Sequence, residues 1–465
     1  MNGRLRDHGS TLLVASLASG FGVLLLQVTG ILGAVVLADD TTGSSATVKT
    51  MLDVVALVFV AIAVYVAAVT TANTVATIVA GRTRVIALLR LIGSSARTQR
   101  ATIAREGLVV GLVGAVLGAL VGTAAAWGIG AVGVATEQIP AFEYSYWTPV
   151  LLVPMVAVVL TTWLSAWTGS RRVLAVRPAE ALGSSGEQSA EELGRRTGRT
   201  ATGVTLIVLG VLALAGGVLV GLVHPAGVLV GVVGGILSFT GVVLVADRIM
   251  PAVLRAVGRW FGTTPPARLA AENAVRNPER STRMTIGLVI GVTLVTMFAV
   301  TMETYRDAMY AVMEGQENVE AMLGPVIDGT VAVFSVLVGF SALIAAVGLV
   351  NTLSVSVLQR TREIGLLRAL GFDRRQVRVM ILAEAAALTV AATLTGLVLG
   401  FVYGWAGAQA MLGSMTGEPA LLAPAVPWVV LAIIVVAAAA LTALASLAPA
   451  RRAGRVSPVV ALAVE

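Results

Sequence analysis

Two short runs of charged and apolar residues are the part of this sequence best suited to a specific chemistry, and that chemistry is recognition rather than catalysis. In the second run, Ile364 and Leu367 share one helical face, and Gly371 stands where a helix would end. Each run predicts a short amphipathic helix that turns apolar residues to a surface and charges to a partner. The residues concerned are Arg82, Arg84, Ile86, Leu89, Arg90 and Gly93 in the first run, and Arg360, Arg362, Glu363, Ile364, Leu367, Arg368 and Gly371 in the second.

Residues for covalent or metal chemistry are scarce. The chain has no cysteine and only two histidines, His8 and His224, which argues against thiol chemistry and against a histidine-based metal site. The single lysine, Lys49, follows Val48, so the Gly-Lys pair of a phosphate-binding loop is absent. We therefore expect a non-catalytic chain that carries no cofactor or metal of its own.

The composition predicts an all-α integral membrane protein. The sequence is 57% hydrophobic and 12% charged, whereas soluble proteins carry about 25% charged residues. Apolar stretches long enough to cross a bilayer recur throughout, and they are too continuously apolar for barrel strands. We predict about ten transmembrane helices, at residues 11–38, 51–80, 107–134, 149–167, 201–223, 227–246, 284–302, 331–353, 380–406 and 427–448. The first apolar run has no small-residue cleavage site after it, so we expect an uncleaved first span.

The basic residues predict the orientation. Of the 32, 30 lie in the termini and in alternate connections, and the opposite side holds only Lys49 and Arg306. Basic residues favour the cytoplasmic side, so we expect both termini in the cytoplasm of a bacterial cell, with the chain in its inner (plasma) membrane. The net charge of +7 then reflects topology. No basic-aromatic module of the kind that binds nucleic acid accompanies it.

An internal repeat organises the chain. The two charged runs lie 278 positions apart, and the same spacing relates Asn73 to Asn351 and Glu106 to Glu384. The asparagines could form hydrogen bonds between helices or mark helix ends, and the glutamates could relay motion or pair with nearby arginines. The repeat predicts two parallel four-span units, residues 1–185 and 267–465, around a central two-span hairpin within 186–266. This is a 4+2+4 arrangement.

Residues 350–371 resemble the signature of the FtsX-like permease domain, a family that includes the MacB and LolCDE permeases. Residues 267–278 and 451–462 resemble the start and end of that domain, and the repeat extends the resemblance to 1–185. The resemblance implies a permease subunit of an ABC transporter, whose separate cytoplasmic ATPase binds ATP and Mg²⁺. It also implies that both charged runs couple to that ATPase. Because the run is duplicated within one chain, we expect one ATPase copy on each run, two per chain. The first run departs from the pattern at Val85, which occupies the position of the acidic Glu363 in the second run. We therefore expect coupling through the first run to be weaker.

Two functions fit this reading. The first is export or extraction of a hydrophobic or amphipathic substrate, such as a lipid, drug or peptide antibiotic, through an apolar cleft walled by the second and eighth spans. The alternative is a mechanotransmitter or sensor that signals to a membrane or external partner without transport.

The outer connections are too short for the large external domain of many family members. A secondary transporter fits less well because the spans are nearly free of charges. An intramembrane enzyme fits least, because no nucleophile and base converge.

Overall fold

The computed structural model describes residues 9–38, 53–72 apart from 55, 56, 63, 67 and 70, then 95–136, 148–170, 197–258, 272, 278–313, 373–414 and 420–453. Every regular element in these ranges is helical. The elements are α2 (Gly9–Ala38), α5 (Ala96–Ala135), η1 (Pro149–Leu151), α6 (Leu152–Gly169), α9 (Thr197–Gly221), α10 (Gly227–Gly258), α12 (Pro278–Met313), α15 (Arg374–Leu412) and α16 (Trp428–Ala453). The 53–72 segment is also helical at its described positions.

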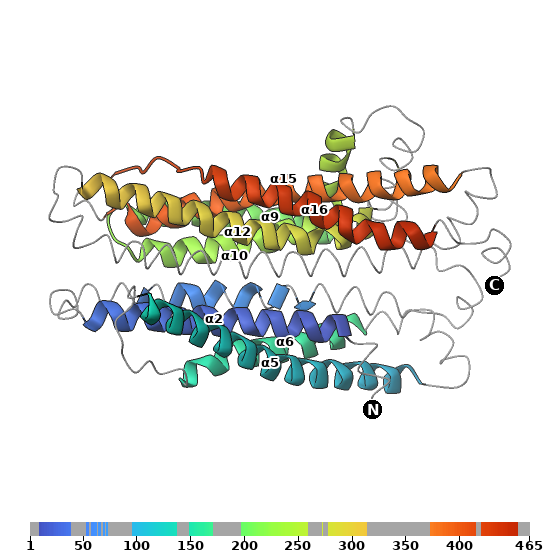
Figure 1. The fold of residues 1–465 in the computed structure, drawn as a ribbon, viewed down its shortest axis with the longest axis horizontal. Coiled ribbons are helices and arrows are strands. Elements are labelled where there is room, and N and C mark those ends of the chain that lie inside the picture. The colour runs from blue at the N-terminus through green and yellow to red at the C-terminus, as the bar shows by residue number, and fades with distance from the viewer. Residues whose placement is uncertain are drawn as a thin grey trace.

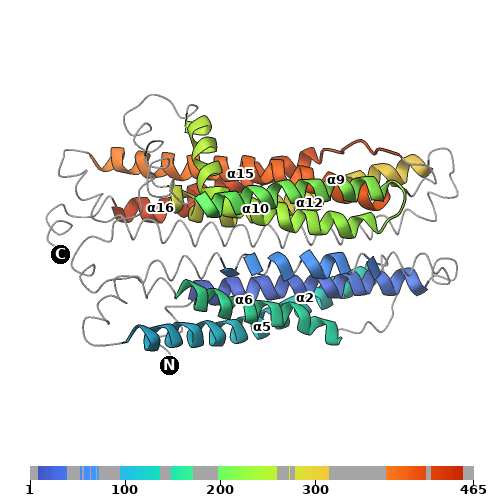
Figure 2. The ribbon, with the colours of Figure 1, turned by 180° about the vertical axis from the view of Figure 1, so that it is seen from behind.

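The helices form two groups that run along the long axis of the molecule (Figures 1 and 2). The first group contains α2, α5 and α6, and the second contains α12, α15 and α16. The central hairpin of α9 and α10 packs on α15 and α12, so it belongs to the second group rather than lying apart from both.

The protein is an all-α, multi-pass membrane protein. Among the described residues, seven helices are long and apolar enough to cross a bilayer. Apolar side chains on α5, α6, α9 and α16 remain exposed, for example Leu120, Leu212 and Val436. Lipid rather than water suits such surfaces. The predicted span at 331–353 lies outside the described residues, so the total of ten stays a prediction.

Several helices extend further than their apolar runs. Helix α5 begins at Ala96 rather than at residue 107, and α15 begins at Arg374 rather than at residue 380. Their N-caps explain the difference: the side chain of Ser95 accepts a hydrogen bond from the backbone of Thr98, and Asp373 forms a reciprocal capping box with Gln376. The two caps are 278 positions apart, so the repeat extends to the helix starts.

Two predicted connections are partly helical. Helix α10 continues past Ala246, where we placed the end of the span, and α12 continues to Met313 through residues predicted to lie in an outer loop. The C-terminal turns of α10 leave the direction of its spanning part (Figures 1 and 2). Pro251 lies within this helix, and proline bends a helix because it lacks the backbone donor.

A second set of contacts fixes the end of α10. Met250, Leu254 and Val257 are buried in a cluster with residues of α12 and α15. At the start of these turns, Asp247 lies 3.8 Å from Arg199, at the beginning of α9. The end of α10 therefore lies across the second group as an amphipathic segment.

The first and third spans of each unit pack closely in the same way. A Cβ atom at Gly118 of α5 would lie 2.2 Å from the backbone oxygen of Ser16 on α2. At Gly400 of α15 it would lie 2.6 Å from the backbone oxygen of Thr293 on α12. Only glycine permits such an approach, so these contacts fix the distance between the paired helices.

The hairpin also depends on close glycine contacts, although not every glycine of α10 makes one. A Cβ at Gly234 would lie 2.5 Å from the backbone nitrogen of Leu214, whereas one at Gly235 would meet nothing within 4 Å. Gly235 therefore does not take part in the close packing of α10 on α9. At the tip, the backbone of Ala226 donates to His224 Nδ1 over 3.1 Å and closes the predicted turn.

An extended segment, residues 420–427, is fastened to the C-terminal end of α15. The fully buried Gln409 donates to the Ala420 carbonyl over 2.8 Å and accepts from the Leu422 backbone over 2.7 Å. The Trp405 indole donates to the Leu422 carbonyl over 3.0 Å. These hydrogen bonds therefore hold the connection between α15 and α16 against the last turns of α15.

Candidate functional site

The helices that directly follow the charged runs are the described part of the candidate coupling site. Both runs, 82–93 and 360–371, lie outside the described residues, as do Asn73 and Asn351. Helix α5 starts at Ala96, three residues after the first run, and α15 starts three residues after the second, at Arg374. A movement of the first run would therefore be passed to α5, which packs against α2, and a movement of the second run to α15, which packs against α12.

The repeated glutamates occupy matching positions on these helices. Glu106 of α5 and Glu384 of α15 each lie 11 residues beyond the N-cap of their helix. Glu106 is half-buried, whereas Glu384 is 6% exposed and adjoins the apolar cluster that contains Ala385 and Leu388. The two copies therefore place the same carboxylate in different surroundings.

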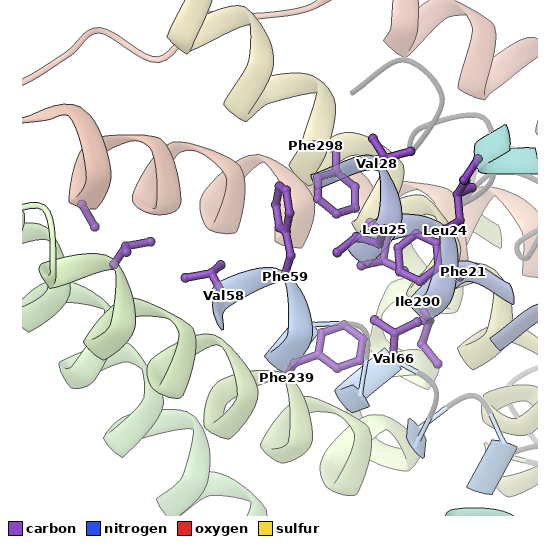
Figure 3. Packing of buried hydrophobic residues seen from close by; sticks show 14 of the residues in the cluster. Phe21, Leu24, Leu25, Val28, Val58, Phe59, Val66, Phe239, Ile290 and Phe298 are labelled. Carbon is purple, nitrogen blue, oxygen red and sulfur yellow. The ribbon is translucent and has the colours of Figure 1, made fainter. Parts of the chain in front are cut away.

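The two groups meet through a packed apolar interface (Figure 3). Phe21 of α2 and Phe59 of the 53–72 segment both contact the ring of Phe298 on α12, with centroid separations of 6.5 and 6.3 Å. Leu24 and Leu25 beside them are fully buried. At this level the predicted cleft between the units is closed. Its other proposed wall, the eighth span, lies outside the described residues.

Helix α10 makes specific contacts with both units at one level. Its Thr240 hydroxyl shares a 2.8 Å hydrogen bond with Tyr65 of the first unit, and its Ser238 hydroxyl shares a 3.0 Å bond with Tyr403 of α15. Between them, the Phe239 ring lies 6.2 Å from that of Tyr65 and 6.4 Å from that of Tyr403. We call Ser238, Phe239 and Thr240 the α10 bridge.

We expect Phe239→Ala to destabilise the folded permease by about 3 kcal/mol, because a buried ring that contacts both units is lost. The measurement is thermal unfolding of the protein in detergent. Val233→Ala is the matched control, since Val233 is on the same helix but exposed. Equal losses from the two substitutions would contradict a bridging role for Phe239.

Comparison with known proteins identifies the repeated units. The model of the FtsX-like permease C-terminal family matches residues 57–178 and, a second time, residues 335–458. Together the matches cover more than half of the chain. This chain belongs to the FtsX-like permease family. Both matches of the FtsX-like permease include a charged run, followed by α5 in the first and α15 in the second.

Individual relatives resemble parts of this FtsX-like permease. The uncharacterized ABC transporter permease YknZ of Bacillus subtilis (strain 168) is 30% identical over 156 residues, which are 34% of this chain and 37% of the relative. The macrolide export ATP-binding/permease protein MacB of Rhodopirellula baltica is 32% identical over 148 residues, 32% of this chain and 20% of the relative. The pyoverdine export ATP-binding/permease protein PvdT of Pseudomonas putida is 31% identical over 137 residues, 30% of this chain and 18% of the relative. The matches thus span 37% or less of these relatives' length.

Some residues that join the elements escaped sequence reasoning. Tyr65, Ser238 and Tyr403 come from three different spans, and no spacing in the sequence relates them. The helix start at Asp373 did carry a signal, because Gln376 stands three residues later, as a capping box requires. At Ser95 only the residue type of the cap pointed to a helix start, since Thr98 contributes its backbone.

Proposed function

We propose that this chain is the permease subunit of an ABC transporter and that a separate cytoplasmic ATPase drives it. The observation that carries the proposal is the double family match within one chain. MacB and PvdT are described as ATP-binding/permease proteins, whereas this sequence has no Gly-Lys phosphate-binding loop. ATP and Mg²⁺ would therefore bind the partner, and this chain would contribute no catalytic residue.

The repeat supports two ATPase copies per chain. Residues 1–185 and 267–465 would each form a four-span unit, with 186–266 holding the hairpin and its linkers. The charged runs would lie on the cytoplasmic face of the bacterial cell membrane, along with both termini. Each run would receive one ATPase, so that one chain supplies both docking sites.

The described contacts suggest how ATPase motion could reach the membrane. A displaced run would push α5 or α15, and the glycine contacts at Gly118 and Gly400 would carry the motion to α2 and α12. These two helices meet at Phe21 and Phe298, so ATP binding and hydrolysis would open or close the apolar interface. A hydrophobic or amphipathic molecule already in the lipid would suit such a path, and its export is the function that we favour.

The stoichiometry of the purified complex tests the coupling arrangement. We expect native mass measurement to give one permease chain with two ATPase copies. An ABC ATPase encoded in the same genome should be co-expressed for the measurement. A complex of two permease chains with two ATPases would contradict the single-chain arrangement.

The packed interface also favours a second candidate, a mechanotransmitter that moves without carrying substrate. Phe21, Leu24 and Leu25 are fully buried there. ATP hydrolysis in nanodiscs separates the two functions. Stimulation by lipid-soluble or amphipathic compounds alone would support export, and stimulation only by a water-soluble sugar or amino acid would contradict it. A complex that hydrolyses ATP without responding to any compound would favour mechanotransmission.

A further inference from the structure

An arginine and a tryptophan form a fixed group where α5 and α6 leave the apolar layer. The Arg100 guanidinium carbon lies 5.4 Å from the centre of a Trp167 ring. Its Nε donates to the Ser170 hydroxyl over 3.4 Å, and that hydroxyl donates to the Trp167 carbonyl over 2.6 Å. These contacts hold the guanidinium in place and leave its Nη groups available to an acceptor.

The group lies at the depth of lipid headgroups. The long apolar run of α5 begins at Gly107, and the helical rise places Arg100 about 10 Å before it. Trp163 and Trp167 are 38% and 39% exposed, at the end of an exposed apolar stripe on α6 that includes Leu160. Tryptophan at the end of a lipid-facing stripe is typical of the membrane interface.

The surrounding charge favours an anion. Arg97, one turn before Arg100, and Arg105 are both exposed. In the portion of the chain that the structure describes, no carboxylate is within ion-pair distance of Arg97 or Arg100. A guanidinium can donate two parallel hydrogen bonds to one phosphate, and tryptophan beside it excludes water from one side.

We propose that Arg100, Arg97 and Trp167 bind the phosphate of an anionic phospholipid on the side of the membrane that carries the arginine-rich connections. Basic side chains between spanning helices are the usual way that proteins hold such headgroups. The lipid would lie outside the interface of the two groups, so it is distinct from any transported substrate. The site requires membrane insertion but no ATPase, and it can therefore be tested independently of the proposed function.

The second unit supplies an internal comparison. It keeps both arginines, as Arg375 and Arg378. It lacks the rest of the group. At the ends of the two units the repeat spacing is 280, as Arg171 and Pro178 show by their match to Arg451 and Pro458. This spacing pairs Trp163 with Ala443, Trp167 with Leu447 and Ser170 with Ala450. The platform that fixes the guanidinium is therefore confined to the first unit, and so is the proposed site.

Native mass spectrometry of the full-length permease tests the proposal with phosphatidylglycerol and phosphatidylcholine as probes. We expect phosphatidylglycerol to be retained preferentially. Arg100→Gln and Trp167→Leu should each lower its retention by about fivefold. Trp167→Leu gives the first unit the residue of the second. Arg378→Gln removes the corresponding charge from the second unit and should leave retention unchanged.

Three results would overturn the site: equal retention of both lipids, equal losses from Arg100→Gln and Arg378→Gln, or displacement of phosphatidylglycerol by excess inorganic phosphate. The last result would identify a site for a soluble anion. Retention in excess phosphate supports a lipid. If Trp167→Leu fails to fold, Arg100→Gln decides the test alone, because the Arg100 side chain is partly exposed and its replacement should leave the fold intact.

Discussion

Adding one methyl group at Gly118 should strongly destabilise the folded permease. The new Cβ in Gly118→Ala would lie 2.2 Å from the Ser16 backbone oxygen and 2.8 Å from the Gly20 backbone nitrogen. Backbone atoms cannot rotate away, so α2 and α5 would have to separate along their contact. We expect a loss of about 3 kcal/mol or more, at the upper end of overpacking effects.

A close glycine contact between α12 and α15 offers the same kind of experiment in the second unit. A Cβ at Gly400 would meet Thr293 and Thr296 of α12 within 2.6 Å, so Gly400→Ala should be equally severe. Gly128→Ala on α5 and Gly407→Ala on α15 are the matched controls, because nothing lies within 4 Å of either position. Yield of monodisperse protein and thermal unfolding in detergent measure the effect. Normal yield and unaltered unfolding of Gly118→Ala would contradict the close α2–α5 packing.

Replacing Glu363 and Arg368 by alanine should uncouple the transporter while leaving it in the membrane. If these charges pair with an ATPase, truncating them leaves partner charges unmatched, which costs about 2–5 kcal/mol in buried interfaces. We expect ATP hydrolysis by the complex to fall by about tenfold or more. Arg84→Ala and Arg90→Ala in the first run should have smaller effects, because Val85 has already removed the acidic residue there.

The coupling experiment needs a separate measure of insertion and assembly. Membrane fractionation and thermal unfolding should match the unmodified protein in all four variants. Equal losses of ATP hydrolysis from both runs would reject the expected asymmetry, and unaltered hydrolysis in every variant would reject the coupling role. Neither result would bear on the packing at Gly118.

The internal repeat and the long apolar helices were the features predicted best from the sequence. The 278-residue spacing and residues 350–371 led to the family that the comparison confirms. The helix ends were less accurate, because apolar runs mark the lipid core, whereas Ser95 and Asp373 mark where the backbone starts to coil. The length of α12 was missed for the same reason: the apolar run ends at residue 302, whereas the helix continues to Met313 through the charged residues Glu303 and Asp307.

Contacts between distant spans could not be predicted. Phe239 and the hydroxyls of Ser238 and Thr240 are ordinary residues of an apolar helix, and only the arrangement of the spans brings Tyr65 and Tyr403 to them. The docking of the hairpin on α15 has no local signature either. Gly221, which approaches Ala410, resembles every other glycine of the hairpin in the sequence.

The docking of the hairpin on α15 has a consequence for synthesis at the ribosome. In the first unit, Ser19 and Gln27 bond to α5 residues only 96 positions later, so these helices can pair soon after the third span is made. The Ser238 side of the α10 bridge must wait longer, because Ser238 and Tyr403 are 165 residues apart, whereas Tyr65, the partner of Thr240, is already made. At typical elongation rates this delay is on the order of ten seconds. During that interval the Ser238 hydroxyl of the nascent hairpin lacks Tyr403, and premature termination before α15 would leave it without that partner.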